Sequence, residues 1–218
     1  NILPIAAFIG AMSAVLISYF IARNSIGLNL ATLILSGVAI STLFGAITTL
    51  LMIKSNPDVR PVLSWLMGSF ISSQWIYCVI TLCYLIPCMI IAIIYSRLLN
   101  VIQLHDNHAK TLGVDLEKVK LILIITATLT TAACVSFVGL VGFVGLICPH
   151  AVRLMWSKDY RILIPTSAVI GAAFLILSDT TARTIVEKTE LPIGIITSFC
   201  GVPFFIFLLI KQRWGIYD

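Results

Sequence analysis

Long apolar runs, separated by short polar stretches, make up most of this chain. A helix that crosses the roughly 30 Å hydrocarbon core of a bilayer needs about 20 mainly apolar residues. Residues 61–73 are apolar but too short to cross, so we expect a partly inserted or interfacial helix there. The remaining runs predict seven spans, at residues 2–22, 30–53, 74–96, 118–138, 143–156, 162–178 and 191–210.

One apolar stretch is too long for a single span. Residues 121–152 contain no Asp, Glu, Lys or Arg, and as one helix they would be about 48 Å long. We therefore predict a helix break there, which Gly139, Gly142 and Gly145 offer, with Gly142, Gly145, Pro149 and His150 as the residues that form it. A polar residue inside a membrane is a functional candidate. His150 lies near a predicted helix end, however, so we expect it to bond a backbone carbonyl at the break, with gating as the alternative.

Composition supports an integral membrane protein. Hydrophobic residues are 60% of the chain, charged residues are 11%, and the mean hydropathy is +1.09, whereas soluble domains have about 45–50% apolar and about 25% charged residues. The runs do not alternate apolar and polar positions, as the strands of a membrane barrel do. The predicted fold class is all-α: a polytopic helical bundle that forms a single transmembrane domain over residues 1–218.

The positive charges divide unequally between the two sides of these spans. Ten of the 14 Lys and Arg residues fall on one side and four, Lys54, Arg60, Arg183 and Lys188, on the other. Because cytoplasmic loops carry the excess of Lys and Arg, we place the first side, and with it the C-terminus, in the cytoplasm. The net charge of +5 is thereby explained without a nucleic-acid partner.

The stretch "LHDNHAKTLGVDLEKVK", residues 104–120, is the most polar part of the chain. Asp106 can cap a short helix that Gly113 ends. The segment is then either an ordinary solvated loop or a handle that a soluble partner grips. His105 and His108 are three residues apart, but two histidines and one carboxylate are weak evidence for a metal site, and we expect none.

Motifs for catalysis are missing from the sequence. It contains no G-x-x-x-x-G-K-[ST], G-x-S-x-G or H-E-x-x-H, so we predict neither a phosphate-binding loop nor an enzyme. A transporter driven by an ion gradient is the alternative function, but such proteins usually carry an ionisable residue near the bilayer midplane. Here the acidic residues outside the long polar stretch fall at span ends or in loops, among them Asp58, Asp179, Glu187 and Glu190.

Several motifs resemble the permease subunit of ATP-binding cassette (ABC) importers for iron siderophores, haem and cobalamin, the FecCD-like, type II importers. The most specific are "VGFVGLICPHAVRL" (141–154) and "SDTTARTIVEKTELPIGIITSFCGVPFF" (178–205). "LILSGVAIS" (33–41), "SWLMGS" (64–69) and "RLLNVIQLHDNHAKTLGV" (97–114) resemble further family segments in the same order. Family members usually have about ten spans, so the chain resembles their C-terminal two-thirds.

The resemblance implies a role for the polar stretch. In this family the cytoplasmic loop, here about residues 97–118, contains a helix that sits in a cleft of a separate ATPase subunit. That helix corresponds to Asp106–Gly113, and the coupling residues are Asp106, Asn107, Ala109, Lys110, Leu112 and Gly113. ATP and magnesium then belong to the ATPase, and this chain binds no cofactor of its own.

The resemblance also implies further partners and a path. An extracytoplasmic substrate-binding protein would dock on Arg183, with Arg60 and Lys54 adding to the surface; an internal ion pair of Arg183 with Asp179 is the alternative for that arginine. A second permease copy, identical or homologous, would complete a path along the dimer axis in a bacterial or archaeal cell membrane. The predicted inner gate residues are Asn29 and Thr32, and the residues predicted to line the outer end of the path are Ser64, Trp65, Gly68 and Ser69.

Overall fold

The computed structural model describes residues 2–24, 27–55, 59–71, 73–104, 116–185 and 191–213. Its helices are α1 (Ile2–Ala22), α2 (Leu30–Ser55), α3 (Val59–Leu66), α4 (Trp75–Leu104), α6 (Leu116–Val138), α7 (Val144–Met155), α8 (Tyr160–Ile185) and α9 (Ile193–Arg213). Two short strands, β1 (Arg23–Asn24) and β2 (Gly27–Leu28), form an antiparallel ribbon between α1 and α2. The predicted all-α membrane bundle is confirmed.

Five helices in the described residues are long and apolar enough to cross a membrane: α1, α2, α4, α6 and α8. The other two predicted spans correspond to shorter apolar helices, α7 and residues 193–208 of α9. At 12 residues, α7 is about 18 Å long, so it reaches only part of the way through the roughly 30 Å core. Five of the seven predicted spans are thus confirmed by length in the described residues, and the one predicted at residues 143–156 is a helix too short to cross.

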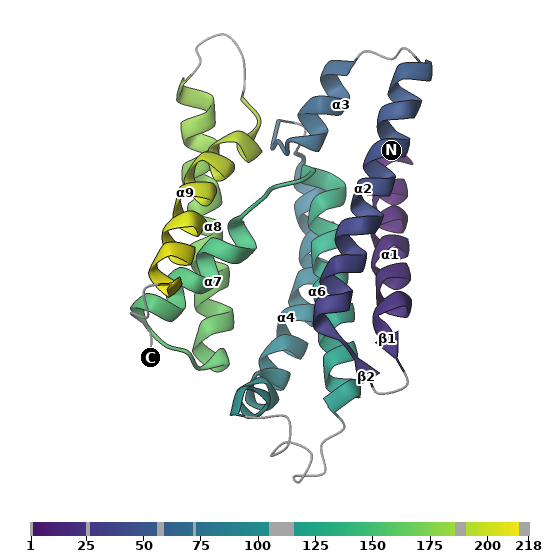
Figure 1. The fold of residues 1–218 in the computed structure, drawn as a ribbon. Coiled ribbons are helices and arrows are strands. Elements are labelled where there is room, and N and C mark those ends of the chain that lie inside the picture. The colour runs from purple at the N-terminus through teal and green to yellow at the C-terminus, as the bar shows by residue number, and fades with distance from the viewer. Residues whose placement is uncertain are drawn as a thin grey trace.

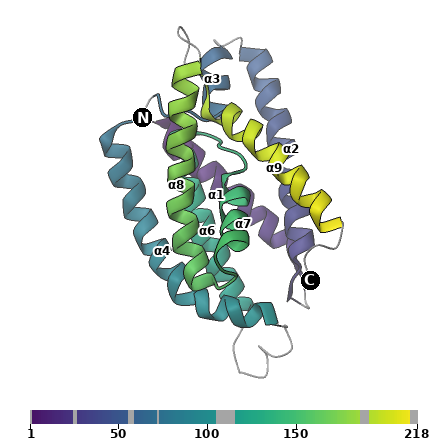
Figure 2. The ribbon, with the colours of Figure 1, turned by 90° about the vertical axis from the view of Figure 1, so that its left-hand side faces the viewer.

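The helices pack in two groups. In the first, α1 contacts α2 and α6, and α6 contacts α4; in the second, α7, α8 and α9 contact one another. Figure 1 shows the two groups beside each other, and Figure 2 shows α8 running the length of the bundle with α4 along one side. Contacts between α4 and α8 join the two groups.

Several helix interfaces contain small side chains, and many large apolar ones face outward. Ala132 and Ala133 of α6 and Ala182 of α8 are buried, whereas Trp75, at 89% exposed, and many leucines and isoleucines face away from the protein. This arrangement suits lipid, where small residues let helices approach closely. The Ser36 hydroxyl on α2 donates a hydrogen bond to the Ser18 carbonyl of α1 over 3.2 Å.

The bundle has two distinct ends (Figure 1). One carries the β1–β2 ribbon, the end of α4, the start of α6 and the α7–α8 turn; we call it the basic end. Its described cations are Arg23, Arg97, Lys118, Lys120, Arg153, Lys158 and Arg161. The opposite end carries α3, the end of α2, the end of α8 and the start of α9; we call it the α3 end. Lys54 and Arg183 lie there, so the helix directions agree with the predicted division of charge.

Candidate functional site

Three segments far apart in the sequence meet through their main chains at the α3 end. They are the residues after α3, the crossover between α6 and α7, and the start of α9. The Ser69 N–H donates to the Val138 carbonyl over 2.8 Å, and the first two N–H groups of α9 donate to the carbonyls of Gly68 and Met67 over 2.9 and 3.0 Å. We call this meeting point the glycine junction.

Each segment contributes one glycine, and any other residue at that position would be strained. Gly68 and Gly139 have φ angles of +72° and +81°, a region that side chains with a Cβ rarely adopt. A Cβ at Gly139 would overlap the Trp65 carbonyl oxygen, and a Cβ at Gly194 would overlap that of Met67. The main chains therefore approach as closely as glycine allows, and this fixes the position of α9 against α3.

An apolar cavity of about 660 Å³ lies beside the glycine junction. Its α9 wall consists of residues spaced three or four apart, which places them on one face of the helix. No charged side chain is among the lining residues, and the pocket has the size of a small-molecule site. The lining residues are Leu66, Met67, Leu140, Gly142, Gly194, Ile195, Ser198, Phe199, Val202 and Pro203.

The predicted outer path residues lie around this pocket: Ser64 and Trp65 on α3, and Gly68 and Ser69 in the junction. Of this segment, the two residues between them, Leu66 and Met67, line the pocket. Gly68 is buried and the Trp65 carbonyl packs on Gly139, so these positions hold the frame of the pocket. Their role in a path stays a prediction.

The predicted inner gate residues lie at the basic end, where α2 begins. Asn29 precedes the helix, and its Oδ1 accepts hydrogen bonds from the N–H groups of Ala31 (3.0 Å) and Thr32 (3.3 Å). This is the geometry of an N-cap. Asn29 and Thr32 thus have a structural role in starting α2, and a gating role stays a prediction.

The chain breaks between α6 and α7, where a break was predicted, and of the three glycines predicted to offer it Gly139 has the unusual geometry. Gly139 and Phe143 have positive φ, Phe143 at 66°, while a Cβ at Gly142 or Gly145 would meet nothing within 4 Å. A Cβ at Gly201 of α9 would collide with the Phe143 ring, so that ring packs onto α9 there. The helix α7 continues through Pro149, and the His150 ring lies edge-on to Phe204, with ring centroids 6.3 Å apart.

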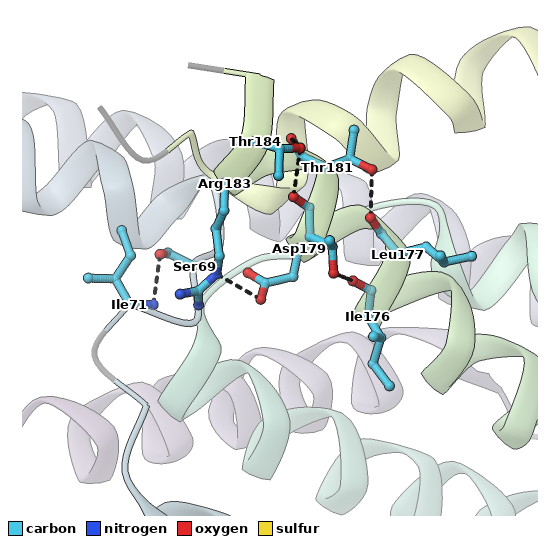
Figure 3. A network of polar contacts seen from close by, with 9 residues as sticks. Ser69, Ile71, Ile176, Leu177, Asp179, Thr181, Arg183 and Thr184 are labelled. Carbon is cyan, nitrogen blue, oxygen red and sulfur yellow. Dashed lines mark hydrogen bonds and ion pairs between the residues drawn. The ribbon is translucent and has the colours of Figure 1, made fainter. Parts of the chain in front are cut away.

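At the α3 end, Arg183 pairs with Asp179 one turn earlier on α8, with 2.9 Å between Nε and Oδ2 (Figure 3). The internal pair weighed against docking therefore forms. The Arg183 side chain is still 47% exposed, and Lys54 is exposed on the last turn of α2. The backbone of Arg60 lies in the first turn of α3 at this end. Docking at these three residues stays a prediction.

The predicted coupling residues, Asp106, Asn107, Ala109, Lys110, Leu112 and Gly113, lie outside the described residues. The flanking helices are described and correct the predicted loop bounds: α4 extends to Leu104 and α6 begins at Leu116. Both of these helix ends lie at the basic end (Figure 1). The polar segment thus leaves and re-enters the bundle on the side with most of the described cations.

Sequence reasoning missed a polar contact at the basic end that joins α4 to the start of α8. The Asn100 amide donates to Asp159 Oδ1 over 2.6 Å, and the Tyr160 N–H donates to Asn100 Oδ1 over 3.0 Å. A hydrogen bond from the Arg161 N–H, followed by that from Asn100, lowers the pKa of Asp159 below its ordinary value of 3.8. The only available signal was an Asp just before an apolar run, which is typical of a helix start.

Fold and site together define a polytopic helical membrane protein with an apolar pocket at one end and a polar segment leaving the other. The sequence matches the FecCD transport family over residues 1–211. The chain belongs to this family.

Named relatives agree with that assignment. The chain is 45% identical to the cobalamin import system permease protein BtuC of Halobacterium salinarum, over 94% of this chain and 55% of the relative. It is 37% identical to the hemin transport system permease protein HmuU of Yersinia pestis, over 96% of this chain and 63% of the relative. The predicted permease resemblance is confirmed, and the chain spans somewhat over half the length of these relatives.

A solved structure agrees with the fold. A metal-chelate type ABC transporter in an inward-facing conformation superposes with a TM-score of 0.83 at 28% sequence identity, covering 97% of this chain and 74% of that chain. The overall arrangement of the helices in this chain thus has a close counterpart in a solved transporter structure.

Proposed function

We propose that the chain is the permease part of an ATP-driven importer that moves an iron siderophore or a related metal chelate, such as haem or cobalamin, into the cytoplasm. The observation that carries the proposal is the FecCD family match over residues 1–211, on a bundle whose polar segment leaves from the basic end. By the positive-inside rule, the basic end faces the cytoplasm.

The partners follow from this orientation. The segment between α4 and α6 would meet an ATPase subunit below the membrane, with ATP and magnesium bound by that subunit. The α3 end, with Arg183 and Lys54 exposed, would receive an extracytoplasmic substrate-binding protein. A second permease copy, identical or homologous, would complete the path, because the pocket beside the glycine junction is open on one side of α9, where Phe199 is 75% exposed.

The pocket chemistry supports a bulky cargo with apolar flanks. The α9 wall presents Ile195, Phe199 and Val202, with one hydroxyl from Ser198. A wall of this kind can contact the organic shell of a chelate without binding it tightly. Import requires such weak binding, because the cargo must be released. The relatives' names point to cobalamin and hemin for those proteins, and we propose cargo of the same chemical class here.

Co-purification tests the proposal. The full-length protein would be expressed beside an ATPase encoded with it, and the complex isolated in detergent. We expect the two subunits in a one-to-one ratio, loss of the ATPase with Leu112→Asp, and retention with Leu112→Met, which keeps an apolar side chain of similar volume.

Uptake gives the second readout. Proteoliposomes that contain the complex and its binding protein would be supplied with ATP and with cyanocobalamin, hemin or a ferric hydroxamate. ATP-dependent uptake of one of these supports the proposal. Uptake that follows an imposed proton or sodium gradient, with no ATPase bound under any nucleotide condition, would refute it in favour of a secondary transporter.

A further inference from the structure

The end of α4 supplies a cap to the start of α8. Asn100 lies one turn before α4 ends at Leu104, and its Oδ1 accepts the first N–H group of α8, that of Tyr160, over 3.0 Å. Its Nδ2 donates to Asp159 Oδ1 over 2.6 Å, and the same Asp159 oxygen accepts the Arg161 N–H over 2.9 Å. Two of the first N–H groups of α8 are thus satisfied, one of them by a residue from another helix.

This contact has a particular place in the bundle. The two helix groups are joined through α4 and α8 and, at the other end, through the glycine junction. The junction is made of main-chain atoms in close contact, so it resists sliding. The Asn100–Asp159 contact is made by side chains, which can hold the two helices together while they tilt.

A route for movement follows from the packing. The polar segment leaves the bundle four residues after Asn100, and α8 packs on α9, which forms a wall of the pocket. Displacement of the end of α4 would pull the first turn of α8, because Asn100 holds both Asp159 and the Tyr160 N–H. Because a helix is rigid between the contacts at its two ends, it transmits such a displacement along its length.

We propose that Asn100 is a positioning residue that passes movement at the end of α4, through Asp159 and the first turn of α8, to the α9 wall of the pocket. The transport part of this inference rests on the proposed function. The mechanical part, that the Asn100–Asp159 pair links the α4 end to α9, concerns this chain alone.

A local cap is the competing role, and the same turn offers a matched control. The Asp159 N–H donates to the Ser157 hydroxyl over 3.0 Å, a hydrogen bond within the α7–α8 turn that does not reach α4. Ser157→Ala therefore weakens the turn without cutting the link. Asn100→Ala cuts the link. The exchanged pair Asn100→Asp with Asp159→Asn restores an acceptor for the Tyr160 N–H and a donor–acceptor contact between the helices, and it gives up the hydrogen bond from the Arg161 N–H, because one Asp159 oxygen accepts both in the native contact.

Hydrogen exchange on the full-length protein in detergent tests the mechanical part. With Asn100→Ala we expect amide exchange to rise about five-fold in the first turn of α8, as for loss of one net hydrogen bond, and also to rise along residues 193–203 of α9. Ser157→Ala should raise exchange only near the turn, and the exchanged pair should return α9 to the wild-type rate. A rise confined to the first turn of α8 in Asn100→Ala would overturn the proposal and leave a local cap.

A transport assay is the second test. It uses proteoliposomes with the ATPase and the binding protein, and cyanocobalamin or hemin is the probe. We expect Asn100→Ala to keep ATP hydrolysis while the cargo moved per ATP falls about five-fold or more, the scale of a typical coupling between sites. A parallel fall in hydrolysis and uptake, or an unchanged ratio, counts against the proposal. Failure of the wild-type complex to move these two probes and a ferric hydroxamate would refute the proposed function, and the exchange result on α9 would still decide the link.

Discussion

Replacing Gly194 with alanine is the sharpest test of the glycine junction. Gly194 is the second residue of α9 and donates its N–H to the Met67 carbonyl over 3.0 Å. Its φ is not in the left-handed region, so backbone conformation does not oppose the change. The added Cβ would instead overlap the Met67 oxygen and sit 3.1 Å from its carbonyl carbon, and real Cβ atoms essentially never come within 3.0 Å of another heavy atom.

The cost follows from what must move. Met67 is backbone here and cannot rotate away, so α9 must shift and lose the two hydrogen bonds that join its first N–H groups to Met67 and Gly68. Two hydrogen bonds contribute about 1–3 kcal/mol, and overpacking adds about 1–3 kcal/mol. We expect Gly194→Ala to lower the free energy of unfolding by about 2–6 kcal/mol.

Thermal unfolding of the full-length protein in detergent, followed by tryptophan fluorescence, measures the effect. A loss of this size lowers the melting temperature by at least about 4 °C. Gly45→Ala is the control, because a Cβ there meets nothing within 4 Å and alanine favours a helix interior by about 0.5–1 kcal/mol. If Gly194→Ala melts at or above the temperature of Gly45→Ala, the close main-chain contact does not hold α9.

Three further predictions concern polar side chains at the two ends of the bundle. Asn29→Ala should cost about 1 kcal/mol of stability through the lost cap of α2, and Asn29→Ser should restore most of it; an uptake defect that persists in Asn29→Ser would instead indicate a gate. In a double-mutant cycle, Arg183→Ala and Asp179→Ala should show a coupling of only about 0.3–0.5 kcal/mol in thermal unfolding, so a much larger loss of binding-protein affinity in Arg183→Ala would indicate docking. Folding lowers the pKa of Asp159, so the stability contributed by its ionised carboxylate is complete above the ordinary value of 3.8 and is lost only as the pH falls through the lower folded value. The rate of amide exchange in the first turn of α8, corrected for intrinsic rates, should therefore not change from neutral pH down to about the ordinary pKa of an aspartate. A change at about pH 6 would contradict this.

The sequence was a good guide to the helices that lie in lipid, because apolar length decides them. The first predicted span, residues 2–22, coincides with α1. Prediction failed where a helix continues past its apolar part. The helix α8 runs to Ile185, beyond the predicted end at residue 178, and Asp179 and Arg183 pair with each other within this extension. The helix α4 likewise continues through Arg97 to Leu104.

The site was harder to predict, since it depends on segments that meet only in the folded chain. Gly68 was placed near a path from its family segment, but nothing in the sequence shows that it meets Gly139 and Gly194. The contact of Asn100 with Asp159 has the same origin, because 59 residues separate the partners. Hydrophobic pattern predicts which elements exist, and it carries little information on which main chains touch.

The glycine junction has a consequence for how proteins of this kind diversify. Main-chain atoms hold α9 in place, whereas side chains such as Ile195, Ser198 and Phe199 shape the cavity beside it. Substitutions at those positions alter the cavity without removing a bond that closes the junction. Replacements on this one helix face can therefore reshape the cavity while α9 stays in place, so the same architecture can carry cavities of many shapes.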